Sequence, residues 1–95
     1  MVVRESRLDT QFANFHAHNP DVYSELARLA RQARDAGRRR IGIKMLYEVV
    51  RWHRFITTSG DEFKLNNNFH SRYARLLMEN EADLGGLFEL RELKT

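Results

Sequence analysis

The chain has 95 residues and no cysteine, and its 16 Lys and Arg stand against 13 Asp and Glu, a formal net charge of +3. This length fits one domain with a small core and excludes a large multi-domain enzyme. The apolar runs are far shorter than the ~18 residues of a membrane-spanning helix, and the lack of cysteine excludes disulfides and thiolate chemistry. We therefore expect a single domain over residues 1–95, located in the cytoplasm and without membrane contact.

The first half of the chain predicts two helices after a loose lead-in over residues 1–8. Residues 9–15 form the first, a short helix with Phe12 and Phe15 on its apolar edge. Asn19-Pro20-Asp21 is typical of the next helix start, with an N-cap, a proline at the first helical position and an acid near the positive end of the dipole. Apolar residues then recur at helical spacing, and Gly37 predicts the C-terminal stop.

The stretch from residue 41 to residue 58 predicts a buried helix that leads into a β-hairpin. Two neighbouring apolar groups leave only a narrow charged strip on the helix, so we expect it to be the most buried helix of the domain. Residues 55–58 and 62–65 are β-prone segments around a turn-forming Ser59-Gly60-Asp61, which predicts the hairpin. The first apolar group consists of Ile41, Met45, Val49, Trp52 and Ile56, and the second of Ile43, Leu46 and Val50.

A last helix follows Asn66-Asn67-Asn68, and one of these three residues is its expected N-cap. Its core face carries Phe69, Tyr73 and two leucines, Leu76 and Leu77. In the tail, residues 84–95, some apolar residues alternate with polar ones as in a strand, and others recur every three residues as in successive helical turns. The sequence therefore does not decide the conformation of the tail. We expect it to pack on the core or to form a homodimer contact. That contact would use Leu87, Phe88 and Leu90.

The predicted fold is mainly α, with about four helices and a short β-hairpin, similar to a winged helix-turn-helix. In that arrangement the second helix of the motif enters the major groove of DNA. The polar face of the last helix carries asparagine and arginine, which pair bidentately with base edges, and a serine that can hold a phosphate. The connection between the two helices is longer than the usual tight turn, and a plain solvated face is the alternative interpretation.

Charge supports an anionic partner. Nine bases stand against two acids between Arg28 and Arg54, whereas five acids stand against one arginine between Glu79 and Glu92. Three consecutive arginines before a helix N-terminus can hold a phosphate together with free backbone N–H groups, although a solvated loop explains them equally well. The candidate nucleic-acid-binding residues are Arg38, Arg39, Arg40, Lys44, Lys64, Asn67, Asn68, Ser71, Arg72 and Arg75.

No catalytic constellation is found in the sequence: it has no nucleophile elbow, no glycine-rich phosphate loop after a strand and no convincing carboxylate pair. His16 and His18 are too few to predict a metal site. We expect a non-catalytic protein without metal or cofactor.

Several short runs resemble a family of small uncharacterised proteins encoded by phages and prophages. The runs are Asn19-Pro20 with Val22-Tyr23, Gly42-Ile43-Lys44, Glu48-Val49-Val50-Arg51-Trp52, Phe63-Lys64-Leu65-Asn66-Asn67-Asn68, Ser71-Arg72-Tyr73-Ala74-Arg75-Leu76 and Phe88-Glu89-Leu90-Arg91. The resemblance implies a small phage-encoded factor that acts in the bacterial cytoplasm as a DNA-binding regulator or as an inhibitor of a host protein. Our leading hypothesis is therefore non-catalytic, regulatory binding of duplex DNA through a basic helical face. The alternative is a module that binds and modulates a host cytoplasmic protein.

Overall fold

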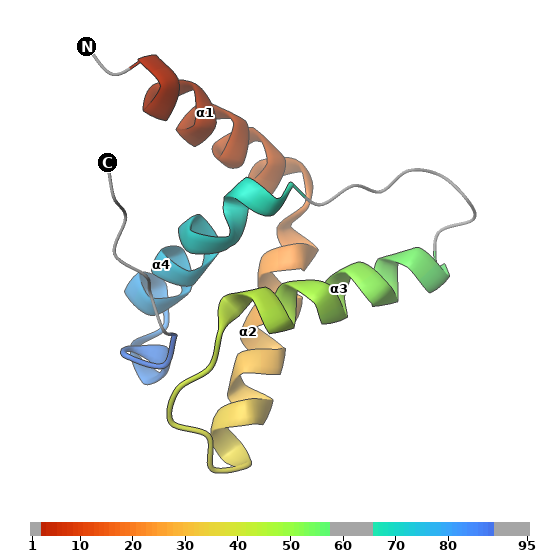
Figure 1. Ribbon diagram of the computed structural model, residues 1–95, viewed down its shortest axis with the longest axis vertical. Helices are drawn as coiled ribbons and strands as arrows, with labels where there is room; N and C mark the ends of the chain where they lie inside the picture. Colours follow the sequence, from red (N-terminus) through yellow and green to blue (C-terminus); the bar gives the residue numbers. More distant parts are fainter. Residues whose placement is uncertain (1–2, 58–65, 89–95) are drawn as a thin grey trace.

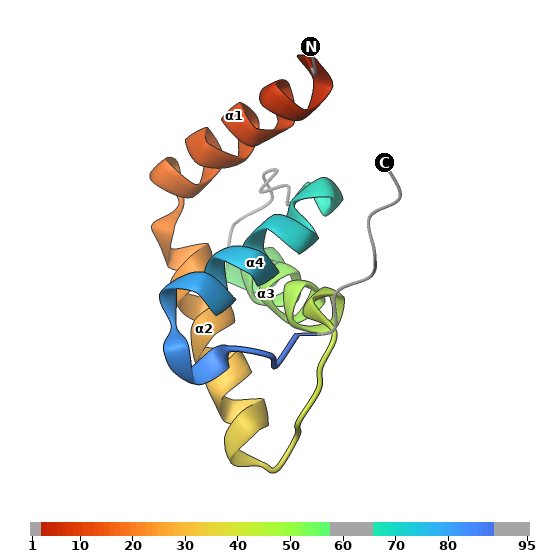
Figure 2. The same ribbon diagram turned by 90° about the vertical axis from the view of Figure 1, so that its left-hand side faces the viewer.

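The computed structural model describes residues 3–57 and 66–88, and within them the chain is helical (Figure 1). The α-helices are α1 (Val3–His18), α2 (Pro20–Asp35), α3 (Ile43–Thr57) and α4 (His70–Asn80), with short 3-10 turns η1 (Asn67–Phe69) and η2 (Ala82–Leu84). Helices α2, α3 and α4 pack against one another, and α1 extends away from the start of α2 (Figure 2). The three packed helices enclose a single core.

The junction of α1 and α2 follows the sequence prediction at Pro20, which starts α2. The Asn19 side chain does not cap α2, because its amide donates backwards to the Phe15 carbonyl at 3.0 Å and so closes the end of α1. Helix α1 begins at Val3, well before the expected start at residue 9. Its Phe12 ring meets the rings of Phe69 in η1 and Tyr73 in α4 at 5.4 and 4.8 Å between centroids, so α1 packs against the start of α4.

The core lies where α2, α3 and α4 meet, and its largest fully buried side chains are Tyr47 and Tyr73. The Tyr47 hydroxyl donates to the Asn66 carbonyl at 2.8 Å, which ties α3 to the start of α4. The Asn66 side chain accepts the Asn68 N–H at 2.8 Å, so Asn66 is the cap among the three asparagines. The remaining buried residues are Val22, Leu26, Ala27, Ala30, Ile41, Ile43, Leu46, Val50, Phe69, Ala74, Leu77, Leu84, Leu87 and Phe88.

The predicted β-hairpin, and with it the winged helix-turn-helix, is wrong. Helix α3 continues to Thr57, so residues 55–57 are helical, and the residues that the structure describes include no β-strand. Two contacts with α2 hold the last turns of α3 in place: His53 with Glu25 and Arg54 with Asp21. These tertiary contacts override the β propensity of the local sequence. The rest of the predicted hairpin, residues 58–65, lies outside the described residues.

The predicted burial of α3 is also wrong in part. The second apolar group, Ile43, Leu46 and Val50, faces the core, whereas Met45 and Trp52 of the first group are each 57% exposed. Helix α3 therefore has one apolar face against α2 and α4 and a second one in solvent.

The start of the tail packs on the core. Leu87 and Phe88 are 6% and 4% exposed, and the Ile41 N–H donates to the Leu87 carbonyl at 3.0 Å beside an isolated bridge from Ile41 to Phe88. Leu87 and Phe88 are thus occupied within the protein's own core, and Leu90 lies outside the described residues.

Candidate nucleic-acid interface

The acidic segment after α4 packs on α2 and neutralises part of the basic middle of the chain. The Arg31 guanidinium donates to Glu81 at 2.6 Å and to Asp83 at 2.9 Å, and Arg34 donates to Asp83 as well. The Tyr23 hydroxyl donates to the other Glu81 oxygen at 2.9 Å. Glu81 and Asp83 of the acidic tail therefore do not form a separate negative surface, because they pair with the arginines of α2.

These contacts shift the acidity of both carboxyl groups. The hydrogen bond from Arg31 is the main reason that the pKa of Asp83 falls to about 2. The pKa of Glu81 is lowered first by Arg31 and then by Tyr23. Both carboxylates stay ionised near neutral pH, so the pairing with α2 persists there.

Pairing extends to most of the basic block between residues 28 and 54. Five of its nine bases form ion pairs, and the remaining four form none with any residue that the structure describes. The paired bases are Arg28 with Glu25, Arg31 with Glu81 and Asp83, Arg34 with Asp35 and Asp83, Arg51 with Glu48, and Arg54 with Asp21. The four others, Arg38, Arg39, Arg40 and Lys44, are all exposed and lie in the α2–α3 loop and the first turn of α3. We call these four residues the cationic loop.

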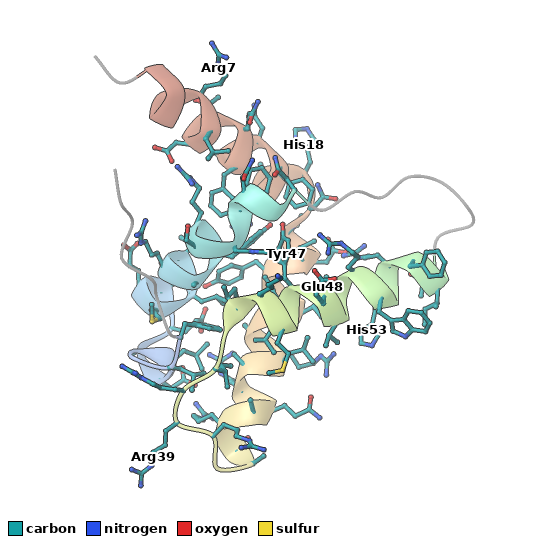
Figure 3. All side chains as sticks on the ribbon, in the orientation of Figure 1. Arg7, His18, Arg39, Tyr47, Glu48 and His53 are labelled. Carbon is teal, nitrogen blue, oxygen red and sulfur yellow. The ribbon has the colours of Figure 1, made fainter. Side chains whose placement is uncertain are left out.

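The three arginines of the cationic loop lie in a segment that backbone hydrogen bonds fix at both ends. Gly37 adopts φ +97° after α2, its N–H donates to the Arg34 carbonyl, and the Arg38 N–H donates to the Ala33 carbonyl. This is the Schellman arrangement that ends helices at glycine. At the other end, the hydrogen bond of Ile41 to the tail holds the chain before α3 begins. Arg39 points away from the body of the protein between these anchors (Figure 3).

The polar face of α4 has the exposure that the sequence predicts, but one of its arginines is engaged. Asn68 and Arg75 are exposed and Ser71 is half-buried, whereas Arg72 donates to Asp9 of α1 at 2.8 Å. Lys64 and the Asn67 side chain lie outside the described residues.

The structure does not bring the two predicted groups of residues together. The start of α4 lies beside the junction of α1 and α2, as the 5.5 Å contact of Phe15 with Phe69 shows, and the cationic loop follows the other end of α2. Both views show this separation along α2 (Figures 1 and 2). Because a 16-residue helix is about 24 Å long, the α4 face and the cationic loop form two patches rather than one.

Sequence reasoning missed the exposed apolar face of α3, which carries Met45, Trp52, Phe55 and Ile56. The signal was present, because two apolar groups on one helix are more than one interface with a core can cover.

The described residues contain no group of three or more histidine or acidic side chains that could hold a metal ion. No helix in this part of the chain is long and apolar enough to cross a membrane.

Comparison with known proteins gives no match: no family model, no curated protein and no solved structure is similar to the chain. The resemblance to a phage protein family stays an expectation without support from these comparisons.

Proposed function

We propose that the protein is a small, non-catalytic DNA-binding protein that contacts the phosphates of duplex DNA through the cationic loop. The observation that carries this proposal is the selective pairing of charges. Within the basic block, the arginines of α2 and of the C-terminal half of α3 pair with nearby acids, whereas the cationic loop keeps four cations in seven consecutive positions, 38–44, without an ion pair to any described residue. In line with the resemblance to phage proteins, the setting we propose is the cytoplasm of a bacterial host.

The geometry of the loop supports phosphate contact. The backbone is anchored at Arg38 and at Ile41, so little backbone freedom is lost when the side chains of the loop bind. Arginine guanidinium groups pair bidentately with phosphate oxygens. Such contacts give affinity and salt dependence but no choice of sequence, so we propose backbone binding and leave base recognition out.

The cationic charges have a structural cost that is partly offset. They precede the positive end of α3, which is unfavourable, but they also follow the carbonyl end of α2, where cations are stabilised. A bound phosphate would remove the remaining repulsion between neighbouring guanidinium groups.

The test is fluorescence anisotropy of a labelled random-sequence duplex, titrated at several salt concentrations. We expect micromolar or tighter binding at low salt with a steep dependence on salt. The triple variant Arg38→Ala, Arg39→Ala, Arg40→Ala should bind at least tenfold more weakly. Its log–log salt slope should be smaller by about 2 to 3, because each lost phosphate contact removes about 0.9.

A matched pair of single variants separates the two patches. Arg39→Ala removes a cation from the cationic loop, and Arg75→Ala removes an exposed cation from α4. The proposal predicts a larger loss of affinity for Arg39→Ala. A larger loss for Arg75→Ala would place the contact on α4 instead. If the wild-type protein does not bind duplex DNA at low salt, the proposal is wrong, and docking of the loop on an acidic host protein becomes the better hypothesis.

A further inference from the structure

Helix α3 exposes an apolar face that nothing in the described part of the chain covers. Met45, Trp52, Phe55 and Ile56 are 57, 57, 71 and 55% exposed. The Trp52 and Phe55 rings contact each other at 5.9 Å between centroids, and so form one aromatic surface. The C-terminal half of α3, which carries this surface, projects beyond α2 (Figure 1).

The spacing of this face is that of a helix-pairing seam. Met45, Val49, Trp52 and Ile56 follow one another at intervals of four, three and four residues. Apolar residues in this alternation average 3.5 residues per turn, which keeps them facing a second helix along its length. The opposite side of α3 already packs on α2 and α4, so no helix of the described residues covers the seam.

We propose that the occupant is a second copy of this chain, with the two α3 helices packed antiparallel about a twofold axis between Val49 and Trp52. In this register Trp52 lies opposite the smaller Val49 of the other copy, and Met45 lies opposite Ile56. A large side chain therefore meets a small one at the centre of the interface. A parallel pair would instead place Trp52 against Trp52. The self-complementary twofold contact is also the commonest way in which soluble proteins associate.

Electrostatics favour the same orientation. Antiparallel packing opposes the two helix dipoles and places Lys44 of each copy near the carbonyl end of the other α3. The two cationic loops lie at the N-terminal ends of α3, and a 15-residue helix is about 22 Å long, so antiparallel packing keeps these like charges far apart. In a parallel pair the loops would meet.

The exposed area agrees with a dimer of moderate affinity. With aromatic side chains of about 150–250 Å² each, four residues that are more than half exposed offer roughly 400–500 Å² of apolar surface per copy. A patch of this size is in the range of the largest apolar patch of a typical monomer, which is often a binding surface, and it is roughly half of the about 800 Å² that each partner buries in a standard stable interface. We therefore expect dimers that form in the micromolar range. The inference does not depend on the proposed DNA binding, and its test contains no DNA.

Trp52 provides a direct test, because it is the only tryptophan in the chain. We would measure sedimentation and tryptophan emission of the purified protein over a wide concentration range. The expected result is a monomer that becomes a dimer as concentration rises, with an emission shift to shorter wavelength at the same midpoint. Ile56→Glu should raise the midpoint concentration at least tenfold, and Gln11→Glu, an equal charge change on exposed α1, should leave it unchanged. Far-UV circular dichroism checks that both variants are folded.

The absence of cysteine allows the orientation to be tested as well. Met45→Cys and Ile56→Cys proteins, mixed and oxidised, should form the mixed disulfide, because these positions face each other in the antiparallel pair. Met45→Cys alone should crosslink poorly. Efficient self-crosslinking of Met45→Cys would overturn the antiparallel register. A wild-type protein that stays monomeric at all concentrations would overturn the proposal altogether, whether its tryptophan emission shows an exposed ring or one covered by the chain itself.

Discussion

The hydroxyl of Tyr73 offers the sharpest test of the core. The side chain is completely buried, and its hydroxyl has no hydrogen-bond partner among the described residues. Burial also raises the pKa of Tyr73 well above its ordinary value, so the group is neutral under all usual conditions. A buried polar group without a partner costs about 1–3 kcal/mol relative to its hydrated state.

Tyr73→Phe removes this cost and keeps the ring that packs against Phe12. We therefore expect the variant to be more stable by about 1 kcal/mol, which corresponds to a rise in Tm of about 4–8 °C in a domain of this size. The measurement is urea unfolding followed by far-UV circular dichroism.

Tyr47→Phe is the matched control. The Tyr47 hydroxyl donates to the Asn66 carbonyl at 2.8 Å, so the same chemical change should here destabilise the protein by about 1 kcal/mol. The prediction is thus a difference in sign between two buried tyrosines. If Tyr73→Phe lost as much stability as Tyr47→Phe, the Tyr73 hydroxyl would have a partner and the reasoning would be refuted.

Three further predictions concern packing, backbone and charge. Leu77→Ala should cost about 2–5 kcal/mol because Leu77 is completely buried, whereas Trp52→Ala should cost less than about 1 kcal/mol at low protein concentration; equal losses in urea unfolding would contradict the exposed position of Trp52. Gly37→Ala should destabilise the protein by at least about 1 kcal/mol, because φ is +97° at this position. An added Cβ would meet no other atom, so the cost comes from the backbone conformation alone. An unchanged Tm would show that alanine adopts this conformation without strain. The pKa of Asp83 is lowered from 3.8 to about 2, so its pairing with Arg31 stabilises the fold fully above about pH 4. This stabilisation is lost as the pH falls from about 4 to about 2. When the free energy of unfolding is measured against pH, Asp83→Asn should therefore lose less stability than the wild type between pH 4 and pH 2. Equal losses in the two proteins would show that ionised Asp83 does not stabilise the fold.

The proposed dimer and the proposed DNA contact use different parts of the molecule. The seam lies along α3, whereas the cationic loop precedes α3 except for Lys44, which lies in its first turn. In the antiparallel pair each dimer presents two cationic loops, one at either end of the interface. Variants of the seam and of the loop therefore separate the two activities.

The sequence by itself determined the local features of the helices. Pro20 and Gly37 mark the ends of α2 because one lacks a backbone donor and the other adopts a positive φ without a Cβ clash. Tyr73 and Leu77 on the buried side of α4, with Arg75 on the exposed side, follow from the 3.6-residue period. These features depend on a few neighbouring residues, and for that reason a single sequence predicts them.

Only the tertiary structure decided which apolar side of α3 is buried and which arginines keep their charge available. Both sides of α3 are apolar, and the choice of Leu46 and Val50 over Met45 and Trp52 depends on where α2 and α4 lie. Arg31 meets Glu81, fifty residues away in the chain, only because α4 packs on α2. The β-prone residues 55–57 remain helical since contacts of α3 with α2 extend the helix. Each of these outcomes depends on contacts between residues that are distant in the sequence, and periodicity and local propensity carry no information about such contacts.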